Sequence, residues 1–166
     1  MIGIDSDTLI KLTRAGAKEV VASAVEIVVS PEVEKEAVDE GKSGGFPDAF
    51  EIERNIKRGL IKVVKARKAG ETETIVRELG LMGGEAGVFR LFMDGKCKAV
   101  ASGDQKFLDL IEALNIPFVT SSALIVYLWK NGKIEKDVCL KLMKKLEPMI
   151  SDEEYQLALF ELKGGS

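Results

Sequence analysis

Short apolar runs alternate with amphipathic segments from the first residues of the chain onward. The β-branched run 25–29 is typical of a buried strand, and Ser30-Pro31 after it supplies an N-cap and a first-turn proline. The alternation continues to about residue 130. The pattern predicts strands at 1–5, 25–29, 60–65, 99–102 and 116–119, and helices at 6–13, 31–40, 48–59, 71–79, 85–93, 105–114, 121–129, 135–146 and 151–162, with a further short helix after Gly16.

Two sequences of the capping-box type mark expected helix starts. Asp48-Ala-Phe-Glu51 and Ser151-Asp-Glu-Glu154 each place Glu three positions after a residue that caps well. Ser121 or Ser122 is expected to cap the helix after the fifth strand. The glycine-rich residues 41–45 are expected to form a loop.

Alternation of strands and helices predicts an α/β fold, with a parallel sheet of about five strands and helices on both faces. The 166 residues, 46% of them apolar and 31% charged, fit one globular domain with a sizeable core. In such sheets the ligand site lies beyond the carboxyl ends of the strands. Candidate functional residues are therefore sought directly after strands.

The chain has no histidine, and this excludes Ser-His-Asp and Cys-His catalysis as well as histidine metal sites. Cys97 and Cys139 lie far apart and form no CxxC pair, so a thiolate metal site is not expected. Acid–base or metal chemistry must then come from Asp and Glu. A carboxylate site favours hard cations such as Mg²⁺ or Mn²⁺.

Neither a signal peptide nor a membrane span is evident in the sequence. The longest charge-free stretch, 113–129, contains Asn, Pro, Thr and two Ser, and the N-terminus has no basic region followed by a long apolar one. We therefore expect a cytoplasmic protein. The three Asn and two Gln beside abundant Lys and Glu are a weak indication of a heat-adapted, thermophile source.

Charge is unevenly distributed although the net charge is only −3. Residues 31–53 hold eight acids and two lysines, whereas 54–70 hold seven basic residues and no acid. The simpler interpretation is a solvated helix face and strand flank. The alternative is a rim that faces the phosphates of a nucleic acid. Its candidates for RNA contact are Arg54, Lys57, Arg58 and Lys62.

Four acids are candidates for one shared site. Asp5 and Asp104 each follow an expected strand, so both lie at carboxyl ends. Glu36 shares a helix side with apolar Val33, and Glu85 stands in the first turn of a helix, where the macrodipole favours a carboxylate. Each acid alone also fits an ordinary cap or surface role. Together they would repel one another, and a bound cation would relieve that repulsion.

The sequences around these acids resemble the four acidic motifs of PIN-domain ribonucleases, in the same order and spacing. The resemblance covers about residues 1–130, and residues 131–163 would be a C-terminal helical extension packed on that domain or on a partner. The motifs read Asp5-Ser-Asp-Thr-Leu, Val33-Glu-Lys-Glu-Ala-Val38, Gly84-Glu-Ala-Gly-Val-Phe-Arg-Leu91 and Val100-Ala-Ser-Gly-Asp-Gln-Lys-Phe-Leu108.

The resemblance implies a three-layer α/β/α sandwich and an endoribonuclease that cleaves single-stranded RNA. Catalytic and metal-binding residues would be Asp5, Glu36, Glu85 and Asp104, which would gather one or two Mg²⁺ or Mn²⁺ ions. Many relatives are toxins of the VapC kind, each inhibited by an antitoxin protein, and homodimers are common among them. An antitoxin and a second copy of the chain are therefore implied partners.

Residues beside the four acids also compare with the family pattern. Ser6 and Ser102 match small polar positions and would support the acids by hydrogen bonds. Asp7 stands where relatives often have Asn or Ser. Gly87 and Lys106 stand where some relatives carry further acids, which leaves a site of four acids and puts a second tightly held ion in doubt.

Two other interpretations stay open. Asp5-x-Asp7 and the segment Asp104 to Asp109 resemble motifs of haloacid-dehalogenase-type phosphatases, with Asp5 as nucleophile and Asp7 as general acid. That interpretation gives Glu36 and Glu85 no role. The third possibility is a non-catalytic module that binds RNA or a protein without cleavage.

Overall fold

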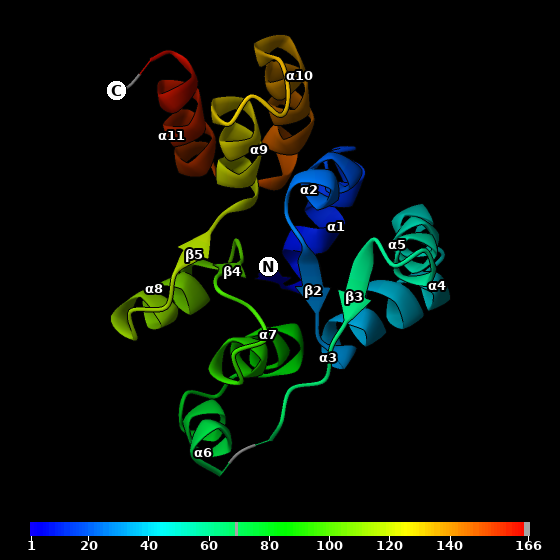
Figure 1. The fold of residues 1–166 in the computed structure, drawn as a ribbon, viewed down its shortest axis with the longest axis vertical. Coiled ribbons are helices and arrows are strands. Elements are labelled where there is room, and N and C mark those ends of the chain that lie inside the picture. Colours follow the sequence, from blue (N-terminus) through cyan, green and yellow to red (C-terminus); the bar gives the residue numbers. More distant parts are fainter. Residues whose placement is uncertain (69, 165–166) are drawn as a thin grey trace.

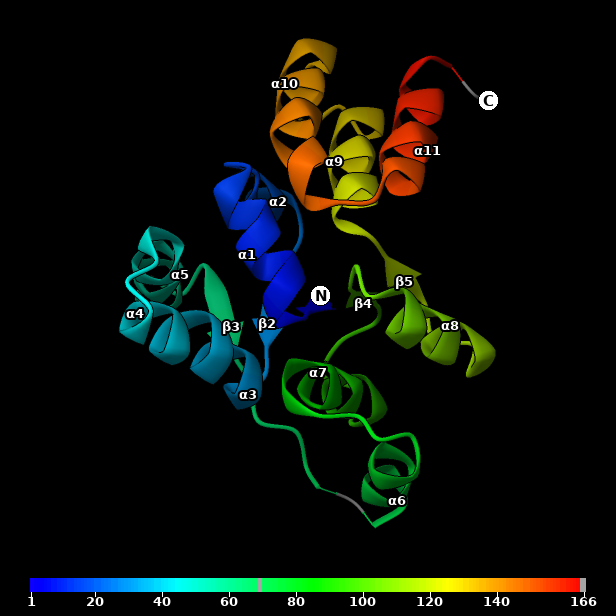
Figure 2. The same cartoon turned by 180° about the vertical axis from the view of Figure 1, so that it is seen from behind.

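The computed structural model describes residues 1–68 and 70–164, and its centre is a five-stranded sheet (Figures 1 and 2). All strand pairs are parallel, and the spatial order is β3-β2-β1-β4-β5. The expected parallel sheet is thus confirmed, and each strand is shorter than its apolar run. The strands are β1 (Ile2–Ile4), β2 (Ile27–Val29), β3 (Ile61–Val63), β4 (Val100–Ala101) and β5 (Phe118–Val119).

Helices enclose this sheet. They are α1 (Ser6–Arg14), α2 (Lys18–Ala24), α3 (Pro31–Glu34), the π-helical segment η1 (Lys35–Glu40), α4 (Gly41–Ser43), α5 (Pro47–Lys57), α6 (Gly70–Glu78), α7 (Gly83–Met93), α8 (Gln105–Ala113), α9 (Ser121–Lys130), α10 (Lys136–Leu146), the 3₁₀ turn η2 (Glu147–Met149) and α11 (Asp152–Leu162).

Successive strand residues point to opposite faces of the sheet and enter apolar clusters on both faces, as the period of two requires. Ile4 and Ala101 lie in the larger core with residues of α1 and α9, whereas Val100 lies in a second core with residues of α7 and α8. On this second face β1 presents Gly3, where a Cβ atom would come within 2.8 Å of Val88 Cγ2. The missing side chain lets α7 pack directly on the central strand. The result is the expected α/β/α sandwich.

Three local expectations are wrong. The segment 41–45 is not entirely loop, because α3, η1 and α4 follow one another without a break as far as Ser43. Helix α5 begins at Pro47 after Phe46 and not with an Asp48 capping box, since Asp48 binds Arg14 instead, with 3.2 Å between Arg14 Nε and Asp48 Oδ1. The N-cap of α9 is Thr120, one residue before the expected serines.

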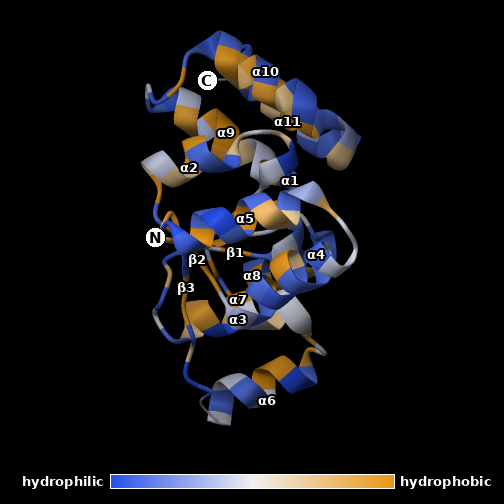
Figure 3. Ribbon diagram, turned by 90° about the vertical axis from the view of Figure 1, so that its right-hand side faces the viewer, coloured by the Kyte–Doolittle hydropathy of each residue, from blue (hydrophilic) through white to orange (hydrophobic). Residues whose placement is uncertain are grey.

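The C-terminal helices are joined to the rest of the chain by apolar packing and by two carboxylates, Glu154 and Glu161, the latter paired with Lys130 at 2.6 Å. Met143 of α10 and Leu162 of α11 lie in the same core as Leu12 of α1. In Figure 3, orange and blue bands alternate along α10, as expected of an amphipathic helix. Ser151 caps α11 as expected, but the Glu154 side chain turns to α9, where its Oε1 accepts from Ser122 N at 3.2 Å and Ser122 Oγ at 2.8 Å.

Candidate active site

Asp5 lies between the central strand β1 and the helix that follows it, α1. It follows β1 and caps α1, with its Oδ1 accepting a hydrogen bond from Thr8 N at 2.8 Å. The residue is only 4% exposed. Burial raises the pKa of the Asp5 carboxyl above its ordinary value, although hydrogen bonds from Ser102 and Thr8 act in the opposite direction. Asp5 is therefore a rigidly held carboxylate whose charge is costly in the folded chain.

Asp104 has the same relation to the neighbouring strand. It follows β4 by three residues and caps α8, with its Oδ1 accepting from Phe107 N at 2.9 Å. Its own backbone N–H donates to Ser102 Oγ at 3.2 Å. Because β1 and β4 are paired in parallel, their carboxyl ends lie side by side. Two equivalent helix caps thus bring Asp5 and Asp104 to one edge.

Glu36 enters from the other side of β1, on the π-helical segment η1. Its Oε1 accepts from Gly84 N at 2.9 Å, and its Oε2 accepts from Ser6 Oγ. The two glycines at the start of α7 make room for it, because a Cβ atom at Gly83 would collide with the Glu36 carboxylate and one at Gly84 would lie 2.8 Å from Oε2. The start of α7 therefore fixes the orientation of Glu36.

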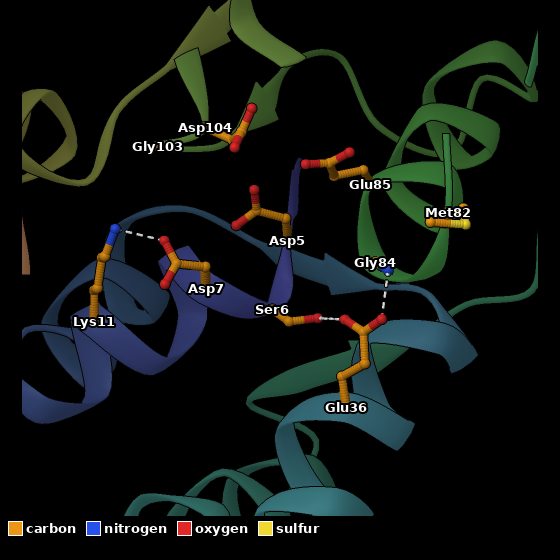
Figure 4. A pocket seen from close by; sticks show the side chains of 10 residues that line it. All are labelled: Asp5, Ser6, Asp7, Lys11, Glu36, Met82, Gly84, Glu85, Gly103 and Asp104. Carbon is orange, nitrogen blue, oxygen red and sulfur yellow. Dashed lines mark hydrogen bonds and ion pairs between the residues drawn. The ribbon is translucent and has the colours of Figure 1, made fainter. Parts of the chain in front are cut away.

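Glu85 is the third residue of α7, and its half-buried side chain faces the other acids. Burial raises the pKa of the Glu85 carboxyl above its ordinary value, and the charges of the other three acids raise it further. Figure 4 shows Asp5, Glu85 and Asp104 pointing toward one another, while Glu36 points to Ser6 and Gly84. The four carboxylates thus form one electrostatically coupled group.

The four acids line one pocket of about 440 Å³ at the carboxyl edge of the sheet. Its lining also includes Asp7 and Lys11, whose side chains form an ion pair at 2.5 Å. Lys11 was not identified from the sequence. Its position one helical turn after Asp7 could have placed it on the same side of the helix as the acids. The remaining lining residues are Ser6, Met82, Gly84 and Gly103.

Beside Lys11 and Met82, the polar side chains that line the pocket are carboxylates and the Ser6 hydroxyl, and these oxygen donors suit Mg²⁺ or Mn²⁺. The mutual repulsion that raises the pKa of Glu85 is the kind of strain that a divalent cation relieves. Within residues 1–68 and 70–164, no group of three or more acids or cysteines already has the spacing of a formed metal site. The chemistry of these donors fits such an ion.

The proposed RNA-contact residues lie elsewhere. Arg54, Lys57, Arg58 and Lys62 do not line the pocket. Lys57 and Arg58 end α5 just before β3 begins, so they lie toward the amino ends of the strands, away from the acids. Lys62 stands on the edge strand β3 and forms an ion pair with Glu26. Ser6 and Ser102, in contrast, do contact the acids or their backbone.

A family model described as a PIN domain matches residues 1–163. The chain belongs to the PIN-domain family. The PIN domain is a nuclease fold, so membership supports a nuclease, and the match includes the C-terminal helices as well as the sheet. Comparisons with curated proteins and with solved structures found no match. Among the described residues, no helix is both long and apolar enough to cross a membrane.

Proposed function

We propose that this PIN domain is a Mg²⁺- or Mn²⁺-dependent endoribonuclease that cleaves single-stranded RNA. The observation that carries the proposal is the convergence of four carboxylates, from four separate elements, on one open pocket. No histidine exists in the chain to supply an alternative acid or base. We therefore assign the acid–base and metal-binding roles to the four carboxylates.

Asp5, Glu36, Glu85 and Asp104 would hold the ion. When bound, a divalent cation lowers the pKa of a coordinated water and stabilises the charge on the phosphate. The protein's part is orientation. Asp5 and Asp104 are oriented as helix caps, and Glu36 is oriented by hydrogen bonds from Ser6 and Gly84.

The toxin role, the antitoxin partner, the homodimer and the cytoplasmic location also belong to this proposal, on the strength of the likeness to VapC-type relatives. Growth arrest on expression, relieved by Asp5→Asn, would support the toxin role. Sedimentation of the purified chain tests the homodimer directly.

The testing experiment incubates the protein with a mixed single-stranded RNA pool and, separately, with a chromogenic phosphate monoester, each in Mg²⁺, Mn²⁺ or EDTA. We expect RNA cleavage that EDTA stops and that Asp5→Asn lowers by at least about 10³-fold. Asp109→Asn is the matched control, because Asp109 is exposed on α8 and does not line the pocket.

Each contrary outcome has a definite meaning. Monoester hydrolysis with intact RNA, lost in Asp5→Asn and in Asp109→Asn, would replace the nuclease by the phosphatase. RNA binding without shortening, in any metal, would leave the non-catalytic module. Full activity in Asp5→Asn would remove Asp5 from the site.

A further inference from the structure

One face of α1 leads away from the acid pocket. Asp7, Lys11 and Arg14 stand at i, i+4 and i+7, so they share one side of the helix. The first two line the pocket, as Figure 4 shows, and the third lies about 10 Å farther along the axis at 1.5 Å per residue. The face thus carries polar and cationic groups outward from the reaction centre.

At the far end of this face an aromatic ring is held against Arg14. Arg14 Cζ lies 5.7 Å from the centroid of the Phe46 ring, and Asp48 fixes the guanidinium through its Nε. A Cβ atom at Gly44 would lie 2.6 Å from the same ring, so the ring rests directly on the Gly44 backbone. Phe46 is nevertheless 50% exposed. The ring is therefore positioned and open to solvent.

A second ring repeats the arrangement one helical turn later. Phe50 is 48% exposed, and Lys42 Nζ lies 5.5 Å from its ring centroid. Lys42 is itself held by Glu53 at 3.0 Å. We call Arg14, Lys42, Phe46 and Phe50 the aromatic corner. Neither ring belongs to an apolar core of the described residues, so core packing does not account for them.

The opposite exit from the pocket is unsuited to a polyanion. Beyond Gly103, which lines both spaces, lies a second pocket of about 580 Å³ between α8 and α11. Its lining includes three carboxylates, Glu153, Glu154 and Glu161. Glu161 pairs with Lys130, so this lining keeps a net negative charge that repels phosphates. On the α1 side, Lys11 and Arg14 balance the charges of Asp7 and Asp48. Charge therefore favours the path along α1.

We propose that a single-stranded nucleic acid leaves the acid pocket along α1 and stacks a base on the aromatic corner. The inference rests on the proposed nuclease function and adds a binding subsite to it. Aromatic rings with nearby cations bind unpaired bases by stacking, without preference for sequence. The 10 Å from Asp7 to Arg14 along α1 corresponds to about three stacked nucleotides at 3.4 Å each, and the Phe46 ring lies against Arg14.

Binding to oligouridylates of two and eight nucleotides, in the Asp5→Asn protein with EDTA present, tests the subsite without catalysis. We expect Phe46→Ala/Phe50→Ala to weaken binding of the octamer about tenfold or more and to leave the dimer unchanged. Phe46→Leu should also lose affinity, because it keeps the apolar volume and loses the π-face. Phe46→Trp should retain it and show fluorescence quenching by the octamer. Phe160→Ala is the control, since Phe160 on α11 is 67% exposed.

The outcomes separate the two proposals. If the wild-type chain neither binds nor cleaves RNA, the proposed function fails and the subsite with it. If it cleaves RNA and the Phe46 and Phe50 variants match Phe160→Ala on the octamer, the subsite alone is wrong. The same conclusion follows if those variants cleave naked RNA normally and lose only the binding of a protein partner.

Discussion

Asp5→Asn should make the protein more stable while it removes activity. Asparagine caps helices as well as aspartate does, so the hydrogen bond from Thr8 N is retained. Only the buried negative charge is lost. Because the pKa of Asp5 is raised in the folded state, its stabilising contribution is complete below the ordinary carboxyl pKa of about 4 and is lost as pH rises through the folded value. The side-chain amide of the Asp5→Asn variant does not titrate, so the variant is free of this pH-dependent loss.

The expected gain in the free energy of unfolding is the gain typical of relieving strain at a functional site. Such substitutions stabilise proteins by about 0.5–2 kcal/mol, which for a chain of this size raises the Tm by about 1–8 °C. When a cation is bound, we expect the wild-type chain to be more stable than the Asp5→Asn variant. At a concentration one hundred times its Kd, the ion stabilises the wild-type chain by about 2.7 kcal/mol, and the variant should gain much less.

Thermal unfolding followed by circular dichroism, in EDTA and in Mn²⁺ and from pH 4 to pH 8, measures both effects. We expect the variant to be the more stable protein in EDTA at pH 7, and the difference to shrink toward pH 4. Asp109→Asn should follow the wild type throughout. A variant less stable than the wild type in EDTA, or equally stabilised by Mn²⁺, would refute the reasoning about Asp5.

Two further predictions concern the positioning of Glu36 and the burial of Lys18. Gly84→Ala places a Cβ atom 2.5 Å from Ser6 Oγ, so we expect the rate of RNA cleavage to fall about 10²-fold. The control is Gly70→Ala at the start of α6, which has open space around it and should leave the rate unchanged. Equal rates for the two variants would contradict the proposed positioning of Glu36. Lys18 is 1% exposed and pairs with Glu51, which is 40% exposed, at 3.1 Å. In urea unfolding, Glu51→Gln should lower the free energy of unfolding by about 2 kcal/mol, less than the 3–5 kcal/mol lost when a fully buried pair is broken. Lys18→Met should lower it by less, because it leaves no unpaired charge buried. The reverse order would refute this account.

The positions of Asp5 and Asp104 could be predicted because each depends only on neighbouring residues in the sequence. Asp5 and Asp104 each follow a short buried strand and cap the next helix, and both features can be read from a few neighbouring residues. Glu36 was predicted from its helix face. Its partner Gly84 lies 48 positions away, and only the packing of α7 against α3 brings the two together.

Two other features depend on residues that lie far apart in the chain. The basic run around Arg58 is continuous in sequence, yet the sheet order sends β3 to the edge and its preceding turn to the amino ends of the strands. The expected capping role of Asp48 was displaced by Arg14, 34 positions earlier in the chain. In both cases long-range strand order or ion pairing, which a short window cannot contain, determined the outcome.

The carboxylate of Glu154 that holds the start of α9, and the core that Leu162 shares with Leu12, set an order of events during synthesis. The ribosome makes α11 almost 150 residues after Asp5, a delay of roughly 7–30 s at 5–20 residues per second. Until α11 emerges, the core beneath α1 lacks one of its walls. The large core on the α1 side of the sheet is therefore completed only after the ribosome has made α11.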